Sequence, residues 1–288
     1  MLVSVACIPE LPEVDDPCGM WTEPGLFHVV VEVEGQRKRR PLVYVPATSG
    51  PRDIVVGLHG GGSSGRSFVA TTLLSPLADR EGLVVIAPDG LGFFRNSWNA
   101  GGGCCGEAGG REHDDVAFLD ATVKEVSRKT CGNNVLAAGF SAGSMMAHRW
   151  GCQGSTVDAV LASSGPMMVD PETCRDRPLP VRHYHGLDDR RVPYEGGYGD
   201  QAQNDFRSVD ETMEAWRQRN GCSAEPPLRL VDGAATCLTW DCDADTTLCS
   251  IEGYGHAWPG GRNQGSSVDA TTEGWAWFEE QFAPSLQQ

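Results

Sequence analysis

The sequence lacks several features that whole classes of protein require. It has no run of about 18 consecutive apolar residues, so no segment is suited to crossing a membrane as a helix. Lysine is scarce, and 23 basic against 39 acidic residues give a formal charge of −16. Nucleic acid and anionic membrane surfaces are therefore poor partners. The paired C-x-x-C spacing that is typical of zinc sites is also missing.

Cysteine, by contrast, is abundant, with 11 residues spread over the chain. This number favours disulfides in an oxidising compartment, and hence an extracellular or cell-surface protein. Adjacent Cys104 and Cys105 are expected to bond to separate partners, because a ring closed by neighbouring cysteines is strained. Four more cysteines precede a glycine-rich loop and are expected to brace it: Cys222, Cys237, Cys242 and Cys249.

The N-terminal residues are unusual for a secreted protein, since "MLVSVAC" is too short to be a signal. We expect Met1 to lie inside a longer apolar signal whose start is missing. Small residues up to Cys7 resemble a bacterial lipoprotein cleavage site, although Ser4 departs from it. Cys7 is thus a candidate lipid anchor, and the alternative is an unpaired cysteine. Residues 1–24 are interpreted as this signal or lipoprotein remnant and a Pro-rich, acidic linker.

Residues 25–288 are predicted to form a single domain of the α/β class. Two β-rich runs surround Glu34–Gly35, and later apolar runs alternate with amphipathic segments. Asp114 or Asp115 is the expected cap of one helix, and Ser208 with Glu211 forms a capping box for another. A further helix is expected near residues 67–82. Strands that alternate with helices favour a mostly parallel sheet with helices on both faces.

Ser141 lies in "VLAAGFSAGSMMAHRW", where Gly139 to Gly143 fit the pattern G-x-S-x-G. A short apolar run precedes the serine and a helix-compatible segment follows it. A nucleophilic serine in a sharp strand-to-helix turn needs such small neighbours, because its backbone is strained and its hydroxyl must project outward. The alternative is a serine that simply caps the helix.

A nucleophilic serine needs a histidine base, and chain order selects one from the seven histidines. In the α/β-hydrolase order the acid and then the histidine follow the serine. His148 is expected to point away from the turn, since it lies two helical turns past Ser141. His256, in "GYGHAWPGG", is the candidate that follows both serine and acid. The others precede Ser141 or lie in the strand before the acid: His28, His59, His113, His183 and His185.

The acid is expected directly after that strand, where "HGLDDRRVPY" offers Asp188 and Asp189. Spacing alone does not choose between the two. An acyl-transfer enzyme also needs backbone N–H donors for the developing oxyanion. The "HGGG" loop at residues 59–62 is a candidate for one donor, and the N–H of Ala142 for the second.

These motifs together resemble a known family. "LHGGGSSG", "GFSAGSMMAHRWGC", "HGLDDRRVPY" and "IEGYGHAWPGG" look like the secreted feruloyl esterase and polyhydroxybutyrate depolymerase family of α/β-hydrolases. The resemblance extends from about Leu26 to Phe282. It implies an α/β-hydrolase fold, and the catalytic residues Ser141, Asp189 and His256. It also places the first oxyanion donor within Gly60 to Gly62, and we predict Gly61 and Gly62 there, together with Ala142.

The resemblance implies a secreted serine carboxyl-ester hydrolase of the feruloyl esterase type, acting on polysaccharide-linked or oligomeric esters of plant cell walls. A polyhydroxybutyrate depolymerase is the alternative, followed by a serine peptidase and an inactive hydrolase-fold protein that binds a polymer. No metal or organic cofactor is implied. Trp98 and Trp258 are predicted to contact the acyl group, and buried packing is the alternative for Trp98.

Overall fold

The computed structural model describes residues 21, 23–48, 50–92, 96–199, 202, 204–263 and 265–283. The predicted signal and linker region, Cys7 included, lies outside these residues, apart from Trp21, Glu23 and Pro24. No helix within the described ranges is long and apolar enough to cross a membrane.

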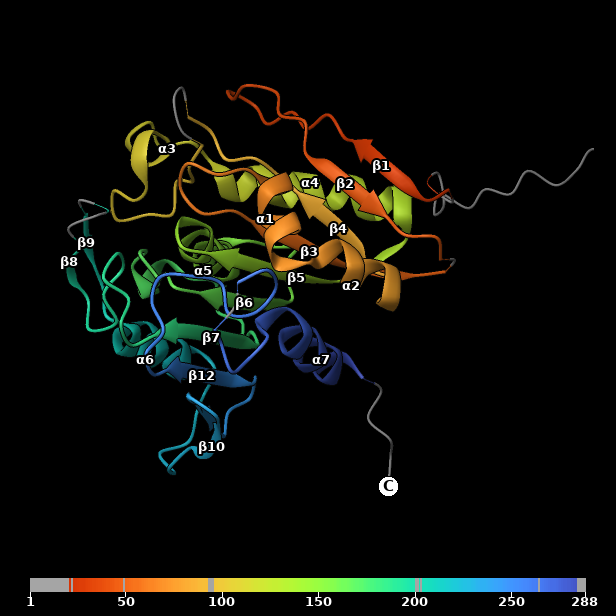
Figure 1. The fold of residues 1–288 in the computed structure, drawn as a ribbon. Helices are drawn as coiled ribbons and strands as arrows, with labels where there is room; N and C mark the ends of the chain where they lie inside the picture. Colours follow the sequence, from red (N-terminus) through yellow and green to blue (C-terminus); the bar gives the residue numbers. More distant parts are fainter. Residues whose placement is uncertain are drawn as a thin grey trace, which may run out of the picture.

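A ten-stranded sheet forms the centre of the described molecule, in the order β1-β2-β4-β3-β5-β6-β7-β12-β11-β10. Figure 1 shows it extending from the red strands of the N-terminal hairpin to the blue strands near the C-terminus. The middle of the sheet, from β4 to β12, is parallel, and the strands at both edges are antiparallel. The strands are β1 (Gly25–His28), β2 (Leu42–Val45), β3 (Arg52–Leu58), β4 (Val84–Ala87), β5 (Gly132–Phe140), β6 (Ala159–Ser163), β7 (Val181–Gly186), β10 (Leu228–Asp232), β11 (Ala235–Trp240) and β12 (Thr246–Ile251).

Alternating side chains of the central strands build two cores, one on each face of the sheet. In β3, Ile54 and Val56 belong to one core and Val55 to the other. This division follows from the two-residue period of a strand. Because both faces are buried, these strands carry apolar side chains at successive positions, as expected for a parallel sheet.

Helices cover both cores. The first core contains side chains of α4 (Asp115–Thr130), α5 (Ala142–Gln153) and α6 (Val209–Arg219). The second contains side chains of α1 (Gly65–Thr72), α2 (Leu74–Glu81) and α7 (Ala270–Phe282). The predicted fold class, a mostly parallel sheet between two helical layers, is therefore confirmed.

Two helix starts agree with the expected caps, and one helix does not agree with its prediction. Asp114 caps α4, and Ser208 and Glu211 form the capping box of α6. The single helix expected near residues 67–82 is instead two helices, because Leu73 adopts a left-handed conformation with φ of 60° between α1 and α2. Short elements complete the described chain: α3 (Gly106–Gly110), η1 (Pro171–Thr173), β8 (Gly197–Gly199) and β9 (Asn204–Phe206).

The edge strands β10 and β11 were not expected from the sequence. All five residues of β10 are exposed. An exposed edge strand has no buried face, so it lacks the alternation of apolar and polar residues that marks a half-buried strand. Here hydrogen bonds to β11, and not burial, define the strand.

Disulfides join segments on the C-terminal half of the sheet. Cys237–Cys249 links β11 to β12, and Cys222–Cys242 links the end of α6 to the turn before β12. All four cysteines precede His256 in the chain, and their bracing of its loop remains a prediction. Cys152–Cys174 joins α5 to the segment after η1, and Cys131 is also disulfide-bonded.

The expectation for the adjacent cysteines was wrong, since Cys104 and Cys105 bond to each other. Their peptide bond is cis and their Cα atoms are 2.9 Å apart.

Candidate active site

The turn at Ser141 depends on small residues. Ser141 joins β5 to α5 and has a φ of 56°. A Cβ on Gly139 would lie 2.2 Å from the carbonyl oxygen of Gly143, and one on Gly143 would lie 2.0 Å from that of Leu58. Backbone contacts therefore require both glycines of the G-x-S-x-G pattern. The Ser141 side chain makes no capping hydrogen bond, so the alternative of a simple helix cap is wrong.

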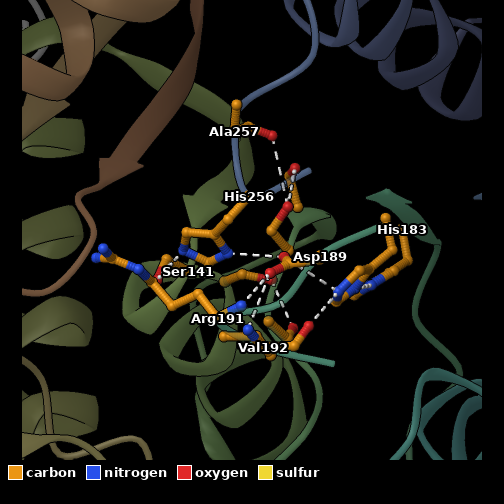
Figure 2. Close-up of polar contacts among 12 residues, drawn as sticks. Ser141, His183, Asp189, Arg191, Val192, His256 and Ala257 are labelled. Carbon is orange, nitrogen blue, oxygen red and sulfur yellow. Dashed lines mark hydrogen bonds and ion pairs between the residues drawn. The ribbon is translucent and has the colours of Figure 1, made fainter. Parts of the chain in front are cut away.

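The side chains of Ser141, His256 and Asp189 come together at the carboxyl ends of central strands (Figure 2). His256 Nε2 lies 3.0 Å from Ser141 Oγ, and His256 Nδ1 lies 2.7 Å from Asp189 Oδ2. A carboxylate only accepts, so Nδ1 carries the ring proton and Nε2 is left to accept from the serine hydroxyl. The three residues follow the parallel strands β5, β7 and β12, whose carboxyl ends lie on the same side of the sheet.

The Asp189 carboxylate is held by donors on both oxygens. The N–H groups of Arg191 and Val192 each donate to Oδ1 at 2.9 Å. Burial of Asp189 opposes ionisation, but hydrogen bonds from His185, His256 and Val192 outweigh it and lower its pKa well below the usual range. The site therefore presents an ionised carboxylate to His256.

Asp188, the other acid candidate, is exposed. Its backbone N–H donates to the carbonyl of Tyr254 at 3.0 Å. The turn after β7 thus distinguishes the two candidates. It directs the Asp188 side chain to solvent and the Asp189 side chain to His256.

The glycine loop after β3 brings Gly61 close to the start of α5. A Cβ on Gly61 would lie 3.9 Å from the Cβ of Ala142. Within the described ranges, neither the Gly61 nor the Ala142 N–H donates a hydrogen bond. Gly62 differs, because its N–H donates to the carbonyl of Asn96 at 2.7 Å. The prediction of Gly62 as an oxyanion donor is therefore wrong for this structure.

The buried side chains of His59 and Trp98 hold the glycine loop after β3 in place. Gly90 N–H donates to His59 Nε2 at 2.9 Å, so His59 carries its proton on Nδ1, which donates to the carbonyl of Gly60 at 2.8 Å. Burial lowers the pKa of His59, which favours this neutral ring. Trp98 is fully buried and donates from Nε1 to the carbonyl of His59 at 2.9 Å. The predicted substrate contact of Trp98 is thus wrong, and its alternative, a packing role, holds.

A cavity of about 250 Å³ opens beside Ser141. Gly61, Ser141 and His256 line it on the side of the reactive groups. Its other walls combine aromatic and polar side chains, among them Phe68, Thr71, Phe140, Trp258 and Asn263. A larger hollow of about 810 Å³ lies over α6, β11 and β12, and it contains none of the three predicted catalytic residues.

The loop that carries His256 is anchored on both sides. A Cβ on Gly186 would lie 2.0 Å from the carbonyl oxygen of Tyr254, so glycine lets the end of β7 approach this loop. Tyr254 Oη and Asn263 Nδ2 both donate to the carbonyl of Trp258 at 2.9 Å. Trp258 is only 2% exposed, and it stacks edge-on against Phe68. Trp258 therefore forms a wall of the cavity, and its contact with substrate remains a prediction.

Sequence reasoning did not find the remaining walls of the cavity. Phe68 and Thr71 come from α1, and Phe140 occupies a free position of the G-x-S-x-G pattern. No motif distinguishes these residues from ordinary core side chains. Their common location depends on α1 packing across the end of β3, which the sequence pattern does not specify.

Residues 55–280 match the alpha/beta hydrolase family, and the chain therefore belongs to that family. This agrees with the resemblance seen in the motifs. Feruloyl esterase B of Piromyces equi is 33% identical over 190 residues, which is 62% of this chain and 34% of that protein. The chain thus spans about a third of that relative's length. A probable feruloyl esterase C of Aspergillus niger is 23% identical over 283 residues, 94% of this chain and 95% of that protein.

Solved structures share the fold. An acetyl xylan esterase from Aspergillus awamori has a TM-score of 0.60 at 16% identity, covering 81% of this chain and 94% of that one. A poly(3-hydroxybutyrate) depolymerase from Bordetella parapertussis has a TM-score of 0.55 at 16% identity, covering 91% and 93%. At such identity the likeness concerns the fold alone.

Proposed function

We propose that this chain is a serine carboxyl-ester hydrolase of the alpha/beta hydrolase family. The observation that carries the proposal is the continuous line from Ser141 Oγ through His256 to Asp189, at 3.0 and 2.7 Å, beside an open cavity. An unactivated serine is a weak nucleophile, and this line is the arrangement that activates it. Curated relatives named as feruloyl esterases support the same class.

In the proposed mechanism, Ser141 Oγ attacks the ester carbonyl carbon while His256 Nε2 takes the hydroxyl proton. Asp189 keeps the ring oriented and stabilises its charged form. The N–H groups of Gly61 and Ala142 donate to the oxyanion of the tetrahedral intermediate. His256 then gives its proton to the leaving alcohol. Water, deprotonated by His256, attacks the acyl-serine, and His256 returns this proton to Ser141 Oγ as the carboxylic acid leaves.

The cavity favours one compact acyl group over a long polymer segment. Its volume of about 250 Å³ lies just below the ~300–1,000 Å³ usual for pockets that enclose drug-sized ligands. Phe68, Phe140 and Trp258 supply aromatic surface, and Thr71 and Asn263 supply polar groups. A hydroxycinnamoyl group has a matching ring and polar substituents. We therefore assign feruloyl-type esters of cell-wall polysaccharides as the substrate class.

An extracellular location is part of this proposal. The support is the set of disulfides, which persist in oxidising compartments. Within this proposal, residues 25–288 form one catalytic domain. Intact-mass measurement with and without alkylation tests the compartment: at most one free thiol is expected, and three or more would contradict it.

A substrate panel tests the assignment. Methyl ferulate, acetylated xylan and a soluble hydroxybutyrate oligomer are compared by kcat/KM, with a feruloyl anilide as the amide control. The expected order places methyl ferulate first and the anilide far below. Faster cleavage of the hydroxybutyrate oligomer moves the assignment to depolymerases, and faster cleavage of the anilide moves it to peptidases.

A further inference from the structure

Three histidines that the proposed triad does not use form a line behind Asp189. His148 Nε2 lies 3.0 Å from His183 Nδ1, and His183 Nε2 lies 3.1 Å from His185 Nδ1. At the far end, the indole Nε1 of Trp216 lies 3.0 Å from His148 Nδ1. All four of these side chains have no exposed surface. The line therefore has no access to solvent along its length.

The fold brings these residues together from three elements. His183 and His185 are two positions apart in β7, so both rings lie on the same face of the strand. His148 comes from α5 and Trp216 from α6, the helices that cover this face. Neighbouring rings are nearly parallel, at 22° between His148 and His183 and 19° between His183 and His185.

The end of the line at Trp216 fixes the position of every ring proton. An indole nitrogen can only donate, so His148 Nδ1 must accept and its proton must lie on Nε2. His148 then donates to His183 Nδ1, which places the His183 proton on Nε2 as well. By the same reasoning, His183 donates to His185 Nδ1, and His185 carries its proton on Nε2.

Charge reinforces this order, because a protonated ring would have two donors facing each other. Burial, with a smaller contribution from the nearby His185 ring, lowers the pKa of His148 to about 3. Burial also lowers the pKa of His183 well below its usual value. Both rings are therefore neutral at the pH where the proposed reaction proceeds.

The near end of the line reaches the acid of the proposed triad. His185 Nε2 donates to the carbonyl of Val192 at 2.9 Å and lies 3.5 Å from Asp189 Oδ2. Val192 in turn donates its own N–H to Asp189 Oδ1. Figure 2 shows Asp189 between His256 on one side and this buried group on the other. His185 thus presents a proton to the carboxylate and holds the carbonyl of Val192, the residue whose N–H binds the second carboxylate oxygen.

Packing alone does not explain this arrangement. Three buried imidazoles are costly unless their nitrogens are paired, and apolar side chains of similar size would fill the space without that cost. The opposite proton order would turn the His185 Nε2 lone pair toward the Val192 carbonyl and the Asp189 carboxylate. That order is excluded at both ends, by the Trp216 donor and by the Val192 acceptor.

We propose that His185 is a positioning residue of the active site, and that the line Trp216–His148–His183 fixes its tautomer so that Nε2–H always faces Val192 and Asp189. The proposal rests on the proposed function, since Asp189 is assigned there as the acid that orients His256. His185 acts through Asp189 and does not contact the substrate.

Ring NMR of protein labelled with ¹⁵N-histidine tests the tautomers directly. Long-range ¹H–¹⁵N correlations should show, for His148, His183 and His185 alike, the ring proton on Nε2 and the lone pair on Nδ1. Assignment uses single His→Gln variants. An Nδ1–H or doubly protonated form of any of the three would overturn the proposal. This readout needs no turnover, so it remains valid if the protein proves not to be an esterase.

Two substitutions at His185 test the effect on turnover. Leu removes both hydrogen-bonding nitrogens, whereas the Gln amide can still accept from His183 and donate to Val192. His185→Leu should lower kcat ~10- to 100-fold with little change in KM, and His185→Gln should recover most of the loss. Equal kcat per folded molecule in wild type and His185→Leu would overturn the positioning role.

A remote pair of variants keeps the test decisive if His185→Leu does not fold. Trp216→Phe removes the indole donor to His148, and Trp275→Phe makes the same change in a buried tryptophan of α7 on the opposite face. Both should lower the Tm, but only Trp216→Phe should lower kcat, by ~3- to 10-fold. Equal effects of the two variants on kcat would limit Trp216 to packing and contradict the line.

Discussion

Two lines of histidine hydrogen bonds meet at Asp189, and they differ in their access to solvent. On the cavity side, His256 keeps 13% of its side chain exposed and touches Ser141. On the core side, His185 is fully buried and leads only to other buried rings. Only the first, which we call the front line, can exchange protons with a substrate or water. We call the second, which extends from His185 to Trp216, the back line. The comparison shows that histidine serves two purposes here. It transfers protons on the cavity side of Asp189 and fixes orientation on the core side.

Removing the front line should have the largest effect. Ser141→Ala and His256→Ala are each expected to lower kcat by ~10⁴-fold or more, because serine, base and acid act as a unit. Hydrolysis of methyl ferulate at saturating substrate measures the loss, and circular dichroism checks the fold. An activity within tenfold of wild type in either variant would exclude that residue from the reaction.

Substitution of Asp189, where the two lines meet, should lower kcat nearly as much. Asp189→Asn is expected to lower kcat by ~10³- to 10⁴-fold, since an amide no longer fixes the proton on His256 Nδ1. Asp188→Asn, one residue earlier and exposed, is the matched control and should change kcat less than twofold or so. Interchanged results would move the acid to Asp188.

The residues of the front line could be named from the sequence, and those of the back line could not. Ser141 and His256 were found because a tight turn demands glycine at 139 and 143 and because chain order leaves one histidine after the acid. Asp189 was separated from Asp188 by the family resemblance alone. The line of buried histidines was missed because it joins α5, β7 and α6 through side-chain directions, which depend on packing and leave no motif in the chain.

Errors elsewhere have similar physical causes. Trp98 was placed in the acyl pocket because it lies in a glycine-rich loop, but its indole donates inward to the loop of His59. Gly62 shares the "HGGG" motif with Gly61, yet only the fold shows that Asn96 takes its N–H. Sequence spacing identified the loop, whereas the choice of donor within it depended on hydrogen bonds from a distant segment.

Narrowing the cavity should separate substrates by size while leaving both lines intact. Thr71→Phe should lower kcat/KM for methyl ferulate by ~10-fold or more, a usual effect for a group that no longer fits its pocket. An acetyl ester should be affected much less. Ala70→Phe is the control on the same helix, at an exposed position outside the cavity. Equal losses on both esters in Thr71→Phe would show that the acyl group binds elsewhere.

The back line should also make the fold sensitive to acid. The pKa of His148 is lowered from 6.5 in the unfolded chain to about 3 by burial, so its contribution is complete above pH 6.5 and is lost as the pH falls toward 3. Within this window each such histidine adds ~1.4 kcal/mol per pH unit to the slope of unfolding free energy against pH.

Urea unfolding at several pH values between about 4 and 7 measures that slope. His148→Gln should reduce it by about the contribution of one histidine, and the exposed His28→Gln should leave it unchanged. An unaltered slope in His148→Gln would mean that this ring is already charged in the folded protein, contrary to the proposed line.

Covalent labelling with a fluorophosphonate tests the central claim most directly, because the probe reacts with a serine only when a base activates it. The account predicts one adduct, located by peptide mass spectrometry on Ser141 in the wild type. The adduct should be absent in Ser141→Ala and formed far more slowly in His256→Ala. Labelling of another serine, or equal labelling rates in wild type and His256→Ala, would contradict a nucleophile activated by His256.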